Sequence, residues 1–355
     1  MNKLTMYGLT EQFTQEARLY EDLALARVIS QYQGMYKVAT AMGERMAEVS
    51  GKFRYAVTDR AEYPAVGDFV MVDHESQASD IVRIHHILTR KSLLLRRAVG
   101  VSHQAQVIAS NLDYLFIAMS LNENYNLNRL ERYLTVGWDS GATPVIVLTK
   151  ADLSNRVEEA LGEVEAMSFY SDVIVTSSKE DNREKFHPYL TTGKTAAFIG
   201  SSGVGKTTLI NMLLRDRRLE TKAVGKEAKG RHTTTSRDSY PTIFGGVVID
   251  TPGMRELGID QADLATSFQD IDMLSKMCKF KDCSHTNEPG CAVQQAIQSG
   301  ELDERRLDSY VKLKHEADYA GLTSKAIEQK KTERMFKDVG GMKQARKFAK
   351  QKRKQ

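Results

Sequence analysis

The fold of this chain is decided by Gly200-Ser201-Ser202-Gly203-Val204-Gly205-Lys206-Thr207, which fits the phosphate-loop pattern G-x-x-x-x-G-K-[ST] at every required position. The apolar run before it, 195–199, predicts a buried strand, and residues 208–214 after it predict the first turns of a helix. A glycine-rich turn that only caps a strand rarely has the Lys-Thr pair and both flanks in place. The stretch therefore predicts a nucleotide-binding α/β domain.

The glycines of this loop let the backbone curl, so that successive N–H groups and the helix N-terminus face a phosphate chain. Lys206 would place its ammonium on the β and γ phosphates, and Thr207 would give its hydroxyl to a magnesium ion. The residues expected to contact the nucleotide here are Ser201, Ser202, Gly203, Val204, Gly205, Lys206, Thr207 and Thr208.

Strands and helices alternate on both sides of this loop, over residues 106–259. Strands are expected at 112–119, 144–148, 172–175 and 247–250, and helices at 127–139 and 154–168. Strands separated by helices of this length predict a parallel sheet that is covered on both faces.

Two polar loops after these strands have the form of guanine-reading loops. Thr149-Lys150-Ala151-Asp152 fits [NT]-K-x-D, in which the carboxylate accepts hydrogen bonds from N1–H and N2–H₂ of guanine. Adenine has no such pair of donors and would leave Asp152 unpaired. Ser177-Ser178-Lys179 has the form of the second loop, whose backbone contacts the guanine O6. A helix N-cap would explain Asp152 equally well on its own; the combination with a phosphate loop favours GTP or GDP.

Two further motifs are expected to follow the γ phosphate and its magnesium ion. Asp250-Thr251-Pro252-Gly253 fits D-x-x-G, in which Asp250 holds magnesium through a water and the Gly253 N–H contacts the γ phosphate. The loop 230–235 contains three threonines, of which Thr234 is our choice to complete the magnesium shell, with Thr233 and Thr235 as close alternatives. A flexible polar loop is the other interpretation of that segment.

The order of these motifs is itself informative. In an ordinary GTPase the phosphate loop comes first and the base-reading loops come last. Here 149–152 and 177–179 precede 200–207, and 250–253 follows, so the sequence predicts a circularly permuted domain. The D-x-x-G switch then becomes the last element of the domain and leads directly into the next one.

That next segment, 260–320, contains all three cysteines of the chain, in the pattern Cys278-x₄-Cys283-x-His285-x₅-Cys291. Three thiolates and an imidazole at this density predict a closed, structural zinc site in a small helical domain. Helices are expected at 292–299 and 303–320. Buried free cysteines are the alternative.

The N-terminal part has a different pattern. Residues 1–25 form a helix-prone extension, and residues 26–100 contain short alternating strands, expected within 27–40, 45–53, 67–73 and 81–90. Four or five strands in so short a segment predict a closed β-barrel of the oligonucleotide-binding type. Basic residues interleaved with aromatic ones favour RNA binding, whereas a barrel that only packs against its neighbour is the alternative.

Composition and charge agree with a nucleic-acid partner. The chain has 355 residues, of which 41% are hydrophobic and 27% charged, and no apolar run is long enough for a membrane span. We therefore expect a cytoplasmic protein. Because no heptad pattern indicates a dimer, we also expect a monomer. Residues 321–355 hold twelve Lys or Arg against three acidic residues, which suits a polyanion. A solvated terminus is the other interpretation of this tail.

Taken together, GSSGVGKT, GRHTTT, DTPG and the zinc motif, behind a β-barrel and in permuted order, resemble the bacterial small ribosomal subunit biogenesis GTPase A family. The resemblance covers nearly the whole chain. It implies GTP hydrolysis stimulated by the small ribosomal subunit during late maturation, binding to its rRNA, and release after hydrolysis. It also implies that Lys206 and Thr207 bind phosphates and magnesium, that Asp152 binds guanine, and that zinc is held by Cys278, Cys283, His285 and Cys291.

Two departures from the usual GTPase pattern qualify the resemblance. Thr149 stands where asparagine is commoner, and it has no amide to brace the base, so a lower nucleotide affinity is expected. Met254 follows D-x-x-G, where many GTPases carry the glutamine that orients the attacking water. Our hypothesis is that His232 supplies this group when RNA is bound; an RNA contact alone is the alternative. A P-loop ATPase and a nucleotide-controlled RNA-binding scaffold are the competing functions.

Overall fold

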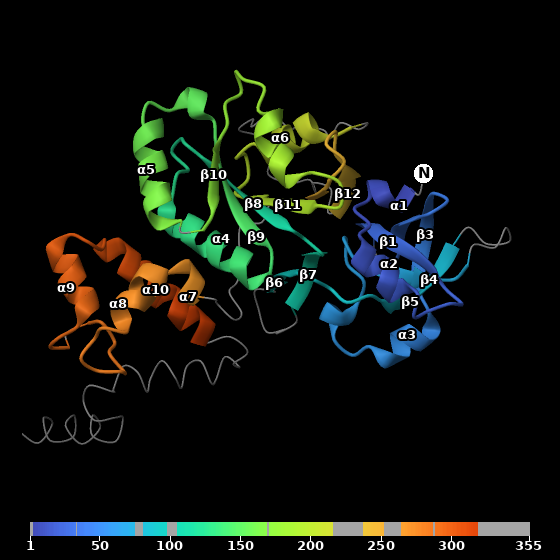
Figure 1. Cartoon of the computed structure of the whole chain (residues 1–355), viewed down its shortest axis with the longest axis horizontal. Helices are drawn as coiled ribbons and strands as arrows, with labels where there is room; N and C mark the ends of the chain where they lie inside the picture. Colours follow the sequence, from blue (N-terminus) through green and yellow to red (C-terminus); the bar gives the residue numbers. More distant parts are fainter. Residues whose placement is uncertain are drawn as a thin grey trace, which may run out of the picture.

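The computed structural model describes residues 3–32, 34–74, 81–97, 105–168, 170–215, 237–251, 264–286 and 288–318. A β-barrel (blue) and a helical module (orange) lie at opposite ends of the molecule, with an α/β sheet between them (Figure 1). This multidomain arrangement is the predicted fold class. Among the described helices, none has the length and apolarity needed to cross a membrane.

The barrel consists of β1 (Ala24–Gln31), β2 (Tyr36–Thr40), β3 (Glu44–Val49), β4 (Phe69–Val72) and β5 (Ile81–Ile87). β1 pairs with both β2 and β4, β3 pairs with β2 and β5, and β4 pairs with β5, so the ring is closed. Alternating valines, isoleucines and alanines fill its interior. The predicted N-terminal barrel is confirmed.

One predicted strand of the barrel is too long. The strand expected over 45–53 ends at Val49, because the Ser50 side chain accepts a hydrogen bond from the Phe53 N–H at 3.1 Å and caps helix α3 (Gly51–Ala56). A 3₁₀ turn, η1 (Arg60–Glu62), follows. The basic and aromatic side chains of α3 are therefore presented on a helix, where Tyr55 is 93% exposed.

The N-terminal extension packs on the barrel. It contains α1 (Lys3–Met6) and α2 (Glu11–Ala17), as the helix-prone composition predicted. Phe13 of α2 is fully buried and stacks on Phe69 of β4, with 4.1 Å between ring centroids. The extension thereby covers the outside of the barrel wall.

The central sheet contains β8 (Tyr114–Ser120), β9 (Thr143–Thr149), β10 (Asp172–Val175), β11 (Thr195–Gly200) and β13 (Val247–Asp250). These strands lie in the order β10-β9-β8-β11-β13, and each neighbouring pair is parallel. The parallel sheet predicted from the alternating pattern is confirmed.

Helices cover both faces of this sheet, also as predicted. One face packs against α4 (Leu127–Asp139) and α5 (Val157–Met167). The other packs against α6 (Lys206–Leu213) and the 3₁₀ segment η3 (Arg183–Tyr189). Helix α6 begins at Lys206, two residues earlier than expected, because Gly205 serves as its N-cap.

Three strands were not predicted. β6 (Leu93–Arg97) and β7 (Ala105–Ser110) form a separate hairpin sheet. β12 (Arg237–Pro241) runs antiparallel to β13 and pairs on its other side with β1 of the barrel. The barrel and the α/β sheet are therefore one continuous, eleven-stranded sheet.

The helical module contains α7 (Leu264–Ser267), α8 (Gln269–Ser275), α9 (Ala292–Ser299) and α10 (Glu304–Asp318). It packs against α4, and its buried residues, including Val293 and Leu307, belong to the same hydrophobic cluster as the α4 side of the sheet. The module is thus continuous with the core of the α/β part.

Candidate functional site

The phosphate loop connects β11 to α6, as its motif predicted. Gly200, Gly203 and Gly205 all have positive φ values, of 145°, 77° and 108°. At Gly200 a Cβ atom would lie 2.4 Å from the carbonyl oxygen of Ala118 on the neighbouring strand, so no other residue fits. Thr207 and Thr208 follow in the first turn of α6, where helix N–H groups point toward the loop.

Lys206 is nearly buried under this loop, with 9% of its surface exposed. Its ammonium donates hydrogen bonds to the carbonyl oxygens of Gly200, at 2.7 Å, and Ser201, at 2.9 Å. Burial lowers the pKa of Lys206 to about 8, and the nearby Asp250 carboxylate opposes that shift. The loop therefore holds a poorly solvated cation at its centre.

Asp250 lies at the C-terminal end of β13, facing this cation. Burial raises its pKa to about 6, Lys206 opposes the rise, and Asp238 on β12 adds to it. The carboxylate and the Thr207 hydroxyl are hard oxygen donors of the kind that Mg²⁺ prefers, and a divalent cation would offset the desolvation of Asp250. These residues fit the predicted magnesium site.

The two loops that were predicted to read the base lie together. Asp152 accepts hydrogen bonds from the Ser178 N–H at 3.0 Å, the Ser178 hydroxyl at 2.9 Å and the Ser177 hydroxyl at 3.3 Å. The bonds from Ser178 are the largest cause of the lowered pKa of Asp152. Lys179 is exposed beside them. Residues separated by about 25 positions in sequence thus form one ionised, acceptor-rich corner.

A hydrogen bond joins this corner to the phosphate loop. The Thr149 hydroxyl, which is buried, donates to the Val204 carbonyl oxygen at 2.6 Å. Lys150 then adopts the left-handed conformation, with φ of 60°, where the chain turns out of β9. Thr149 lacks the amide of the commoner asparagine, but its hydroxyl braces the phosphate loop.

Several predicted site residues lie outside the described residues. They are His232, Thr233, Thr234, Thr235, Gly253 and Met254, together with the basic segment 321–355.

The predicted metal ligands converge. The ligand atoms of Cys278, Cys283, His285 and Cys291 all lie within 4.8 Å of one another. The Cys278 and Cys291 sulfurs are 3.9 Å apart, and the His285 Nδ1 atom lies 3.7 Å and 3.5 Å from them. Tetrahedral zinc with Zn–S bonds of about 2.3 Å requires sulfurs separated by about 3.8 Å. The cluster can therefore hold one tetrahedral metal ion.

Two residues that sequence reasoning missed support these ligands. The Glu288 carboxylate accepts from the Ser284 N–H at 2.9 Å and the Thr286 N–H at 3.0 Å, which closes the loop that carries His285. The Gln294 amide donates to the His285 carbonyl oxygen at 2.6 Å. Both are polar residues close to the motif, but their spacing follows no metal pattern.

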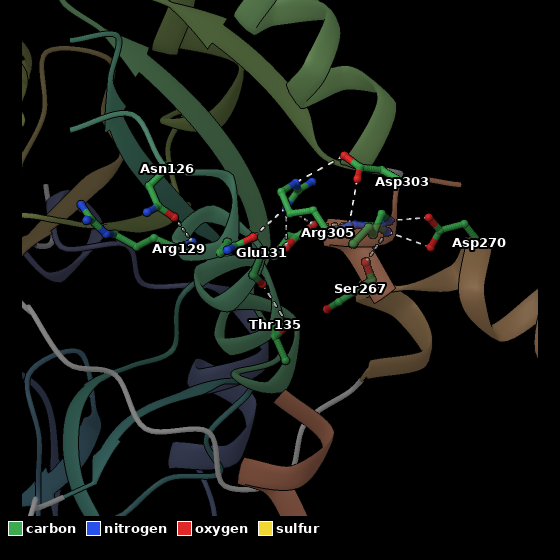
Figure 2. Close-up of polar contacts among 10 residues, drawn as sticks. Asn126, Arg129, Glu131, Thr135, Ser267, Asp270, Asp303 and Arg305 are labelled. Carbon is green, nitrogen blue, oxygen red and sulfur yellow. Dashed lines mark hydrogen bonds and ion pairs between the residues drawn. The ribbon is translucent and has the colours of Figure 1, made fainter. Parts of the chain in front are cut away.

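A buried ionic network joins the helical module to α4 (Figure 2). Glu131 of α4 is 1% exposed and accepts from Arg305 at 3.2 Å and from Arg306 at 3.1 Å. Arg306, 4% exposed, also donates to Asp270 of α8 at 2.8 Å and to the Ser267 carbonyl oxygen at 3.1 Å. Arg305 also pairs with the more exposed Asp303 at 3.5 Å, so three carboxylates and two guanidinium groups form the network. No sequence pattern indicated it.

Comparison with known proteins agrees with this geometry. The model of the RsgA GTPase family matches residues 87–260. The small ribosomal subunit biogenesis GTPase RsgA 2 of Lactiplantibacillus plantarum is 47% identical over 350 residues, 98% of this chain and 97% of that protein. RsgA 2 of Vibrio vulnificus is 38% identical over 326 residues, 90% of this chain and 89% of that protein.

Solved structures show the same fold. The crystal structure of YjeQ from Thermotoga maritima superposes with a TM-score of 0.63 at 26% identity, covering 83% of this chain and 98% of that one. YloQ, described as a circularly permuted GTPase, gives a TM-score of 0.59 at 27% identity, covering 83% and 95%.

Proposed function

Because the chain belongs to the RsgA family of GTPases and is therefore a GTP hydrolase, we propose that it acts on the small ribosomal subunit. In this proposal it binds the subunit and its rRNA late in maturation. GTP hydrolysis is accelerated by the bound subunit and drives release. The protein works as a monomer in the cytoplasm.

The observation that carries the nucleotide-binding part of this proposal is the hydrogen bond from Thr149 to the Val204 carbonyl oxygen. It fixes the loop that would read guanine at Asp152 against the loop that would hold the phosphates. A single nucleotide spanning both loops would therefore meet a pre-organised site. Adenine has no pair of donors for the Asp152 carboxylate, which argues against the ATPase alternative.

Within this proposal each part of the site has a role. Lys206 and the loop N–H groups would bind the phosphates, while Thr207 and Asp250 would hold magnesium, which would neutralise phosphate charge. Thr234 would complete the magnesium shell, and the Gly253 N–H would contact the γ phosphate. His232 would orient the attacking water when RNA is bound. The cysteine and histidine ligands hold one structural zinc ion.

The RNA partner is supported by the relatives' names and by the surface of the barrel. The L. plantarum and V. vulnificus relatives are both called small ribosomal subunit biogenesis GTPases. On this chain, α3 exposes Lys52, Arg54 and Tyr55 together. A basic helix with an exposed aromatic ring suits a phosphate backbone and stacking on an unpaired base.

The test is GTP turnover by the full chain alone, with small ribosomal subunits and with large subunits. We expect acceleration only by small subunits. Background turnover under all three conditions would support a nucleotide-controlled scaffold instead. Asp152→Asn should shift preference from guanine toward xanthine nucleotides, whereas efficient displacement of bound GTP by ATP would support the ATPase.

A further inference from the structure

A polar row crosses three neighbouring strands beside the phosphate loop. Ser30 of β1 is directly opposite Asp238 of β12, and Asp238 is directly opposite Asp250 of β13. Directly opposed residues of antiparallel strands project their side chains from the same face of the sheet, with Cβ atoms about 5 Å apart. The carboxylate of Asp238 therefore lies next to that of Asp250.

The packing of the same strands identifies this face. Tyr240 and Val248, two residues along from Asp238 and Asp250, form the next pair on the same side. Both pack in the hydrophobic cluster that contains Leu209 of α6. Asp238 and Asp250 thus project toward the side of the sheet covered by α6, the helix that begins at Lys206.

The barrel fixes the position of Asp238. The Ser30 hydroxyl, which is buried, donates a hydrogen bond to the Asp238 carboxylate. Because β1 pairs with β12, it also occupies what would otherwise be a free sheet edge. A residue of the barrel therefore sets the geometry of a carboxylate one strand away from Asp250.

We propose that Asp238 is a positioning residue of the magnesium site: held by Ser30, its carboxylate accepts hydrogen bonds from the water shell of the ion that Asp250 would hold. This inference rests on the magnesium role of Asp250 in the proposed function. Mg²⁺ keeps several of its waters in protein sites, and carboxylates in the outer shell orient them.

Two physical arguments favour this role. The strand register places the negative charge of Asp238 next to that of Asp250. Two neighbouring carboxylates repel each other, and a divalent cation held by Asp250 would relieve that repulsion. Ser30 meanwhile donates to one oxygen of Asp238, and the described part of the chain has no recorded donor to the other, which can accept from water. The RNA-binding barrel would in this way contribute directly to metal binding.

The experiment measures release of a fluorescent GDP from the full chain across a range of magnesium concentrations. In Asp238→Asn, we expect the magnesium concentration for half-maximal slowing of release to rise about 10-fold. Release at saturating magnesium should not change. Asp238→Glu should recover part of the loss, and Ser30→Ala should shift the midpoint in the same direction by a smaller factor.

Ser239→Ala is the matched control. Its side chain projects from the opposite face of β12, and its buried hydroxyl has no hydrogen-bond partner among the described residues. We expect its magnesium midpoint to equal that of the wild type. If melting temperatures show that all variants are folded, a magnesium midpoint in Asp238→Asn equal to those of the wild type and Ser239→Ala would overturn the inference. If Asp238→Asn does not fold, the magnesium midpoints of Ser30→Ala and Asp238→Glu test the inference in the same assay, and wild-type midpoints in both would overturn it.

Asp250→Asn separates this inference from the proposed function. If it also leaves the magnesium midpoint unchanged, the magnesium site itself is wrong. If Asp250→Asn shifts the midpoint while the Asp238 and Ser30 variants do not, only the role of Asp238 fails.

Discussion

Lys206 and Asp250 are two charged residues whose ionised forms are both disfavoured by burial. The pKa of Lys206 falls to about 8 and that of Asp250 rises to about 6, so their titrations approach each other. In the folded protein without ligands, both residues are nevertheless charged between these two values. Burying these two charges in this site costs free energy, which bound phosphate and magnesium would offset.

This arrangement predicts a pH-dependent effect of Asp250→Asn on stability. Because the folded-state pKa of Asp250 is raised, the folded chain binds its proton more tightly than the unfolded chain from about pH 4 to 6. The Asp250 contribution to stability therefore falls as pH rises through that window. Without nucleotide or magnesium, Asp250→Asn should raise the unfolding free energy about 1 kcal/mol more at pH 7 than at pH 5.

Urea unfolding at the two pH values measures this difference. Glu184→Gln, which removes an exposed carboxylate, controls for the general effect of losing one negative charge. An effect of Asp250→Asn that is the same at pH 5 and pH 7 would contradict the prediction.

Sequence patterns located some site residues and could not locate others. Lys206, Asp152 and the metal ligands follow from spacing, because the backbone of a short motif places their side chains directly. The position of Asp238 does not follow from spacing. It depends on the register between β12 and β13, whose paired residues are 12 positions apart, and on pairing with a barrel strand more than 200 residues away. Long-range register leaves no local signal.

Among the secondary-structure elements, β10 (Asp172–Val175), β13 (Val247–Asp250) and α9 (Ala292–Ser299) were predicted residue for residue. The predicted ends of β8 and β9 differ from the observed ones by one or two residues. β12, with the sequence Arg-Asp-Ser-Tyr-Pro, was missed because polar residues dominate a strand that pairing with β1 and β13 stabilises. Tertiary context outweighs strand propensity at such positions.

The junction between α4 and α10 makes a testable contribution to stability. Glu131→Gln would leave Arg306 buried with one charged partner, Asp270, in place of two. Removing one member of a buried ionic network typically destabilises a protein by about 3–5 kcal/mol. We expect a loss of that order in urea unfolding.

Arg132→Gln on the same helix provides the comparison. Arg132 pairs with Glu316 of α10 at 2.7 Å, but both side chains are about one-third exposed. Such pairs contribute about 1 kcal/mol or less. Equal losses in the two variants would show that burial of Glu131 does not set the strength of the junction.

At the scale of the whole molecule, the α/β part is continuous with its neighbours on both sides. Its sheet extends through β12 into the barrel, and its core extends through α4 into the helical module. Arg27 strengthens the barrel side: it is completely buried and donates to the carbonyl oxygens of Tyr7 and Gly67 and to the Thr195 hydroxyl at the start of β11. The strand that leads to the phosphate loop is thereby fixed to the barrel and the N-terminal extension.

This continuity predicts that loss of the metal destabilises the whole protein, and not the helical module alone. Cys291 and Val293 belong to the hydrophobic cluster that includes Leu130 and Leu134 of α4. If the metal ligands separate, these residues no longer pack on α4, and its apolar side chains become exposed to water. In calorimetry, Cys283→Ser should contain no zinc and should unfold in one transition, about 5–10 °C below the wild type.

Chelation of the wild-type protein should lower the melting temperature in the same way, and added zinc should restore it. Chelation should not affect Cys283→Ser, which controls for removal of other cations. Two separate transitions, with the later one at the wild-type temperature, would mean that the helical module unfolds independently. In that case the shared core would not couple it to the α/β part, and the Glu131 junction would open without affecting the nucleotide site.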